Sequence, residues 1–256
     1  MMQPLRPARC LPVRKKRFGD AMAAGCVIFD FDGVIADTEA LHLECYNSVL
    51  AAAADRVGRI VHISPQQYLQ RYMVYGNREA FANILSDAGF AADNSFIEEL
   101  CRQKDQIFAG QLGGFLSPLP GVRELVEHLQ ARGVERGICS GARRDEITPL
   151  LSAFGLESHF PVIVSIDDVR RSKPEPEGYN KAFDLLNIRA DGSLARQRSV
   201  VFEDTAGGAA AAHAAGLHVI GVATTSGLGD VRQWADQAVA SLAEVDLYQL
   251  NRLLGV

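Results

Sequence analysis

Two hydrophobic patterns share most of the chain: short continuous apolar runs, and longer segments with apolar residues at helical spacing. The first run, Cys26–Phe29, is typical of a strand buried on both faces, as in a parallel sheet covered by helices. Later strands are predicted at 134–139, 162–165, 199–202 and 218–223. Helices are predicted between them at 122–132, 145–154, 179–186 and 206–215. This alternation predicts an α/β fold with a doubly wound parallel sheet.

The segment after the first strand has a purely helical pattern and interrupts the alternation. Ser64, Pro65 and Gln67 together predict a helix start, with a side-chain cap, a proline in the first turn and a capping-box glutamine. Further helices are predicted at 41–52, 77–89 and 95–108. We therefore expect an all-helical domain over residues 37–115, inserted into an α/β core that is made of residues 22–36 and 116–256.

The first 21 residues are basic and rich in proline, with no apolar run long enough for a secretory signal. We interpret them as a disordered tail. They could also be a targeting sequence, or an upstream extension of a reading frame that starts at Met22. The extension is the better of these two alternatives, because strand-like sequence begins almost directly after Met22.

The composition is that of a globular protein, with 48% hydrophobic and 22% charged residues. A formal net charge of -5 argues against a nucleic-acid-binding protein, which needs clustered positive charge. Five cysteines without CxxC spacing indicate neither a disulfide framework nor a zinc site. No apolar stretch reaches the roughly 18 residues of a membrane span. We expect a cytoplasmic monomer or small homo-oligomer without membrane association.

Polar residues follow the predicted strands at the points where their carboxyl ends would meet. Asp30 and Asp32 end the first strand, and Ser140 ends the second. Lys173 lies in the loop after the third, and Glu203–Asp204 ends the fourth. Functional groups gather at this edge of an open parallel sheet. Two carboxylates as close as Asp30 and Asp32 repel each other unless a cation or a proton intervenes, which favours a functional interpretation over a merely polar strand end.

These residue types match the needs of phosphate-ester chemistry. Such a reaction requires a nucleophile, neutralisation of the phosphoryl oxygens, a proton donor and a hard cation. Asp30 and Asp204 form an oxygen-rich site suited to Mg²⁺, with Glu203 as a further candidate ligand. Attack by a carboxylate would give an aspartyl-phosphate intermediate, and Asp32 is spaced to donate and accept the proton.

In order along the chain, Asp30–Thr38, Ser140–Gly141, Lys173–Pro174 and Glu203–Thr205 resemble the four motifs of the haloacid dehalogenase superfamily. The helical insert resembles the cap of its beta-phosphoglucomutase and phosphoglycolate-phosphatase branch, and the resemblance extends from Cys26 to Ala223.

The resemblance implies that Asp30 is the nucleophile and Asp32 the acid/base. Ser140, Gly141 and Lys173 would hold the phosphoryl group. Asp30 and Asp204 would bind Mg²⁺ together with the backbone carbonyl of Asp32, and Glu203 would be a further ligand.

Within the family, Asp32 with Glu203–Asp204 favours phosphoryl transfer over carbon–halogen cleavage. Three cap residues resemble positions that bind a distal anionic group: Arg78 in the stretch Gly76–Glu79, Lys104, and His42 near the hinge. Each also has a plain interpretation. Arg78 and Lys104 could be ordinary helix-surface residues, and His42 a packed histidine.

The second motif departs from the mutase pattern, because Ser140–Arg144 lacks the expected asparagine. We therefore predict a Mg²⁺-dependent phosphatase of a small phosphorylated metabolite. The alternatives are a beta-phosphoglucomutase-like sugar-phosphate mutase and, more remotely, a non-catalytic ligand-binding protein on the same scaffold.

Overall fold

The computed structural model describes residues 23–73, 75–111 and 117–256. The predicted basic tail, the proposed start at Met22 and the predicted core boundary at Leu116 lie outside these residues. The strands are β1 (Val27–Phe29), β2 (Arg136–Cys139), β3 (Val162–Val164), β4 (Val200–Glu203), β5 (His218–Val222) and β6 (Gln237–Val239). They form one sheet in the order β3-β2-β1-β4-β5-β6, and every neighbouring pair is parallel. The predicted doubly wound parallel sheet is confirmed.

Two details differ from the sequence prediction. The second strand begins at Arg136 rather than Val134, because Gly133 adopts a left-handed conformation and the Val134 amide closes the preceding helix on Leu129. β6 was not predicted, because it has three half-buried residues and no distinctive apolar run.

Helices cover both faces of the sheet, as the continuous apolar strands require. The core helices are α6 (Val122–Ala131), α7 (Arg144–Ala153), α8 (Glu177–Arg189), α9 (Ala206–Ala214), α10 (Leu228–Val231) and α11 (Leu247–Leu254). Side chains of α6, α7 and α11 pack with Val27 and Phe29 of β1 in one apolar cluster. Side chains of α8 and α9 pack with Cys26 and Ile28 in another. Alternate residues of one strand thus contribute to opposite faces.

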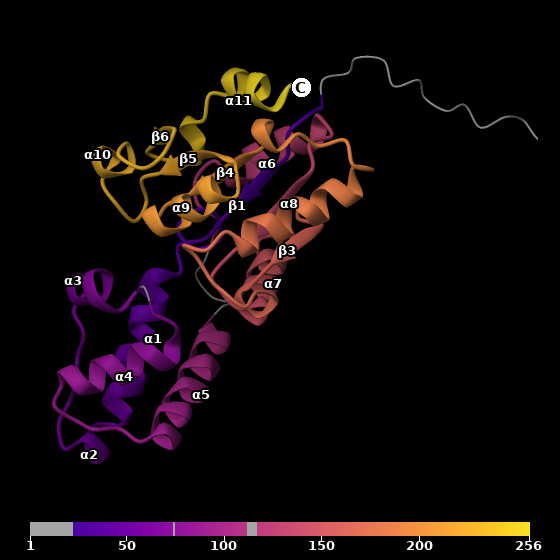
Figure 1. Ribbon diagram of the computed structural model, residues 1–256. Helices are drawn as coiled ribbons and strands as arrows, with labels where there is room; N and C mark the ends of the chain where they lie inside the picture. The colour runs from indigo at the N-terminus through magenta and orange to yellow at the C-terminus, as the bar shows by residue number, and fades with distance from the viewer. Residues whose placement is uncertain (1–22, 74, 112–116) are drawn as a thin grey trace, which may run out of the picture.

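The helices between β1 and α6 gather beside the sheet as a separate group (Figure 1). They are α1 (Glu39–Ala52), α2 (Ala54–Val57), α3 (Pro65–Gln67), a π-helical turn (Tyr68–Tyr72), α4 (Asn77–Asp87) and α5 (Asn94–Gln111). We call residues 39–111 the helical unit. It has its own apolar cluster, with Leu50, Phe81 and Leu100 fully or almost fully buried. The predicted capping box at Ser64 is present, because Ser64 and Gln67 exchange side-chain-to-backbone hydrogen bonds.

Two chain segments connect the helical unit to the sheet, and they run side by side. Ala36 and Pro118 form an antiparallel bridge, and the Leu119 amide donates to the Ile35 carbonyl at 2.9 Å. The helical unit therefore joins the core at one place, next to the carboxyl end of β1. Among the helices of the described residues, none has both the length and the apolar character to cross a bilayer.

Candidate active site

The site begins in the tight turn that follows β1. The amides of Ile35 and Ala36 both donate to the Phe31 carbonyl, which folds the chain back directly after the strand. Gly33 within this turn has φ 73°, and a Cβ there would lie 2.0 Å from Oδ2 of Asp204. Glycine is thus required both by the backbone conformation and by the close approach of Asp204.

The loop after β5 holds Asp204, which directly follows β4. The Thr225 hydroxyl donates to Oδ2 of Asp204, and the Thr224 hydroxyl donates to the Gly33 carbonyl. The other carboxylate oxygen, Oδ1, is buried and has no hydrogen-bond partner among the described residues. Buried polar atoms are almost always paired, so an unpaired carboxylate oxygen indicates a place for a cation.

Lys173 reaches this acidic cluster from the loop after β3. Its ammonium lies 2.7 Å from Oδ1 of Asp30 and also donates to Oε1 of Glu203. The Lys173 side chain is 18% exposed and the Asp30 side chain 9%, so the ion pair is largely withdrawn from water. Its charges are therefore little screened by solvent.

The carboxylates strongly influence one another's protonation. Burial raises the pKa of Asp30 from 3.8 to about 7, against the opposing effect of Lys173. Burial, followed by the charges of Asp30 and Glu203, holds the pKa of Asp204 well above its ordinary range. Burial would also raise the pKa of Glu203, but Lys173 and several hydrogen bonds outweigh it and lower that pKa. The cluster thus has an excess of negative charge at Asp30 and Asp204.

Oxygens of Asp30, Glu203 and Asp204 lie within 4.8 Å of one another. Together with the unpaired Oδ1 of Asp204, this set fits a small hard cation that prefers carboxylate and water ligands. The residues present therefore fit Mg²⁺.

Asp32 and Ser140 lie beside this cluster. The Thr38 hydroxyl donates to Oδ1 of Asp32, and burial raises the pKa of Asp32 from 3.8 to about 7. Thr38 precedes α1 but makes no side-chain cap on it, because its hydroxyl is directed to Asp32. The Ser140 hydroxyl accepts a hydrogen bond from the Ala142 amide at 2.9 Å. Gly141 is exposed and faces open space, which leaves its backbone accessible to a ligand.

His42 and Lys104 meet in the interior of the helical unit. Lys104 is fully buried, and its ammonium lies 2.8 Å from Nδ1 of His42. The His42 ring stacks on Phe108 at 4.4 Å between centroids. Burial, reinforced by the Lys104 charge, holds the pKa of His42 well below its ordinary value, and burial lowers the pKa of Lys104. His42 is therefore a neutral acceptor at Nδ1, which leaves Nε2–H as a donor.

Arg78 has different surroundings from the other predicted residues. Its half-exposed guanidinium forms an ion pair with Glu98 at 2.8 Å. In the described part of the chain, no contact joins Arg78 to Asp30 or Lys173. Arg144, which stands where the mutase pattern has asparagine, donates to the Ile163 carbonyl and to Asp168.

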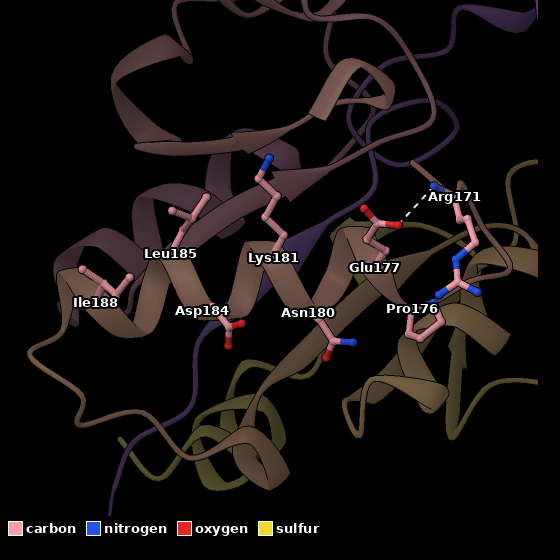
Figure 2. Close-up of a pocket in the computed structure, with 8 residues that line it drawn as sticks. All are labelled: Arg171, Pro176, Glu177, Asn180, Lys181, Asp184, Leu185 and Ile188. Atoms are coloured by element: carbon pink, nitrogen blue, oxygen red, sulfur yellow. Dashed lines mark hydrogen bonds between the residues drawn. The ribbon is translucent and has the colours of Figure 1, made fainter. Parts of the chain in front are cut away.

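A broad hollow of about 500 Å³ lies along α8 (Figure 2). It is lined by Arg171, Pro176, Glu177, Asn180, Lys181, Asp184, Leu185 and Ile188, and none of these is a predicted site residue. Glu177 accepts from the Arg170 and Arg171 amides and so fixes the loop that contains Lys173. The predicted site residues at the sheet edge are therefore not part of the lining of this hollow.

Sequence reasoning missed Tyr179, whose hydroxyl donates to Glu203, and Thr225, whose hydroxyl donates to Asp204. It gave no role to Thr38 and Gly33. The glycine after Asp32 was a visible signal for a left-handed turn. Thr225 had no signal, because its contact with Asp204 arises only when the loop after β5 folds back over β1.

The chain matches the family of haloacid dehalogenase-like hydrolases over residues 27–222. It is 30% identical to the protein CbbY of Rhodobacter capsulatus over 230 residues, which are 87% of this chain and 95% of the relative. It is 31% identical to a phosphorylated carbohydrates phosphatase of Thermotoga maritima, over 76% of this chain and 82% of the relative. The structure of CbbY from Rhodobacter sphaeroides in complex with phosphate is similar, with 25% identity, a TM-score of 0.74 and coverage of 89% of this chain and 99% of that one.

Proposed function

The chain belongs to the haloacid dehalogenase-like hydrolase family, and we propose that it is a Mg²⁺-dependent phosphatase of small phosphorylated carbohydrates. Membership agrees with the resemblance of its four motifs, and the named phosphatases among its relatives agree with a phosphoric monoester hydrolase. The observation that carries the proposal is the meeting of Asp30, Lys173 and Asp204 at one edge of the sheet.

In the proposed reaction, a carboxylate oxygen of Asp30 forms a bond to phosphorus while the phosphorus–oxygen bond to the leaving group breaks. Asp32 gives its proton to the departing oxygen. Asp32 then accepts a proton from a water that attacks the same phosphorus, which releases Asp30 and inorganic phosphate. The raised pKa of Asp32 supports this role, because a group with a pKa of about 7 exchanges protons readily near neutral pH.

Charge neutralisation would come from Lys173 and the metal. An ammonium has three donors, and Asp30 and Glu203 use two of those of Lys173, so the third remains for a phosphoryl oxygen. Mg²⁺, when bound by Asp30, Asp204 and the Asp32 carbonyl, would offset the negative charge of the phosphoryl group. Ser140 and the accessible backbone of Gly141 would hold another phosphoryl oxygen.

The helical unit would act as a cap that closes over the substrate and excludes water. His42, oriented by the buried Lys104, would offer its Nε2–H to the leaving group when the cap closes, and Lys104 would add a positive charge behind it. A leaving group rich in hydroxyls or carrying a negative charge suits them, as in a phosphorylated sugar.

A phosphatase is favoured over a mutase by two arginines. A mutase must grip a second phosphate while the sugar reorients. Arg78 is paired with Glu98, and Arg144 replaces the asparagine of the mutase pattern and is tied to Asp168. Each side chain already has an acidic partner, which supports the phosphatase over the mutase.

The test is a panel of phosphorylated metabolites with Mg²⁺, in which free phosphate and isomerised sugar are scored separately. We expect phosphate release without isomer formation. The matched variant Asp30→Asn should retain the circular dichroism spectrum of the wild type and lose turnover by more than about 1000-fold, because the amide is not a nucleophile. Retention of the wild-type rate by this variant would rule out Asp30 as the nucleophile. Isomer formation without phosphate release would identify a mutase instead.

A further inference from the structure

Glu203 is the most heavily hydrogen-bonded carboxylate of the site. Its Oε1 accepts from the Lys173 ammonium and from the Tyr179 hydroxyl, the latter at 2.8 Å. Its Oε2 accepts from the Asp204 amide and from both the amide and the hydroxyl of Thr205. Five donors hold the fully buried Glu203 carboxylate in one orientation.

Tyr179 is fully buried at the start of α8, and two glycines make its contact with Glu203 sterically feasible. A Cβ at Gly178 would lie 2.8 Å from the Cys139 sulfur, so glycine lets α8 approach the end of β2 closely. A Cβ at Gly208 on α9 would lie 1.7 Å from Oε1 of Glu203, so glycine leaves room for the carboxylate. The Lys173 ammonium lies 5.0 Å from the centre of the Tyr179 ring, within the range of a cation–π interaction.

We propose that Tyr179 is a positioning residue for catalysis: through Glu203 it holds the Lys173 ammonium against Asp30. The proposal rests on the phosphatase function proposed above.

The direction of the effect follows from the shared oxygen. Lys173 and Tyr179 both donate to Oε1 of Glu203, and Lys173 also donates to Asp30. The tyrosine hydroxyl satisfies part of the hydrogen-bonding capacity of Glu203. Without it, Glu203 attracts the ammonium more strongly and draws it away from Asp30. The phosphoryl group would then lose part of its neutralisation in the transition state, where that neutralisation matters most.

Tyr179→Phe is the test variant, because it removes only the hydroxyl and keeps the ring. With p-nitrophenyl phosphate as the probe, we expect kcat to fall by about 5- to 30-fold while KM changes by less than about twofold. The packing control is Phe183→Leu on the same helix and in the same apolar cluster, which should lower stability with kcat unchanged.

A double-mutant cycle tests whether Tyr179 acts through Glu203. Glu203→Gln should lower kcat, and adding Tyr179→Phe to it should have little further effect, because the contact is already altered. The Mg²⁺ concentration for half-maximal activity should stay within about threefold of the wild type in Tyr179→Phe, because Tyr179 contacts Glu203 and not the metal group itself. Independent, additive losses, or a large rise in that Mg²⁺ concentration, would overturn the proposal.

A readout without turnover separates this inference from the proposed function. Lysine ammonium signals in ¹H–¹⁵N spectra report hydrogen-bonded lysines, and Lys173→Met identifies the signal of Lys173. We expect that signal to shift or broaden in Tyr179→Phe and to stay in place in Phe183→Leu. An unchanged signal in Tyr179→Phe would refute the positioning role. Absence of phosphate release by the wild type would refute the phosphatase function alone.

Discussion

Asp32→Asn should stabilise the metal-free protein and abolish its catalysis. Burial raises the pKa of Asp32 from 3.8 to about 7, so at neutral pH and above its ionised form opposes folding. Asparagine has nearly the same shape, and its amide oxygen can accept the same hydrogen bond from Thr38. The substitution therefore removes the charge and the transferable proton but preserves the local contacts.

The size of the effect depends on pH. A carboxyl with a higher pKa in the folded than in the unfolded state destabilises the fold only as it ionises, so the cost is absent below about pH 4 and is complete above about pH 7. A rise from 3.8 to about 7 corresponds to at most about 4 kcal/mol. Asp32 keeps some exposure to solvent, so we expect a gain of about 1–3 kcal/mol at pH 8. In a chain of this length, that gain raises the Tm by about 2–10 °C.

Thermal unfolding in the presence of EDTA, followed by circular dichroism at pH 5 and pH 8, measures this effect. The Tm gain of Asp32→Asn should be at least twice as large at pH 8 as at pH 5. Asp37→Asn at a nearby exposed carboxylate is the matched control and should show no such gain. A Tm at pH 8 equal to or below that of the wild type would refute the reasoning from burial.

Three further predictions concern other parts of the molecule. Gly33→Ala should lower phosphate release by more than about 100-fold and stability by about 2–4 kcal/mol in urea unfolding, because φ is 73° and the added methyl would meet Asp204. Asp168→Asn should lower the free energy of unfolding by about 1–2 kcal/mol at pH 7. Burial raises the pKa of Asp168, but hydrogen bonds from Ser165 and Arg144 outweigh it and lower that pKa to about 2. The difference between variant and wild type in urea unfolding should therefore disappear as the pH falls from 4 toward 2. EDTA should abolish phosphate release. Mg²⁺ at about 100 times its Kd should add about 2.7 kcal/mol to the thermal stability of the wild type but not to that of Asp204→Asn.

The sequence predicted the sheet well because buried parallel strands are short apolar runs between turns. Five strands were predicted from that pattern, and the polar residue after each of the first, second and fourth marked the edge of the sheet where the candidate site lies. The pattern was less informative after Ala223. α11 was not predicted, although Asp246 caps it and Leu250 and Leu254 bury one face. Its short length gave the helical spacing few residues in which to repeat.

Side-chain partnerships were harder to predict than positions. That Asp30 and Asp204 come together follows from strand order, since strands β1 and β4 are neighbours, whereas Lys173 reaches them from the loop after β3, two strands away from β1. That Glu203 faces Lys173 and Tyr179 depends on how closely α8 and α9 approach the sheet, which Gly178 and Gly208 determine. A glycine in a sequence indicates freedom of the backbone, but not which side chain will occupy the space beside it. The roles of the catalytic and cap residues, and the domain boundaries, stay predictions.

The charge balance of the site links these observations. Asp30, Glu203 and Asp204 contribute three negative charges when ionised, and Lys173 contributes one positive charge, so the cluster is short of two positive charges. Without a cation, the raised pKa values of Asp30 and Asp204 mean that the protein compensates by holding protons. A divalent ion would restore the balance with both aspartates ionised, and the proposed attack on phosphorus requires an ionised Asp30. Lys173 pairs with both Asp30 and Glu203 and offsets one of the three negative charges, so a divalent metal would offset the other two.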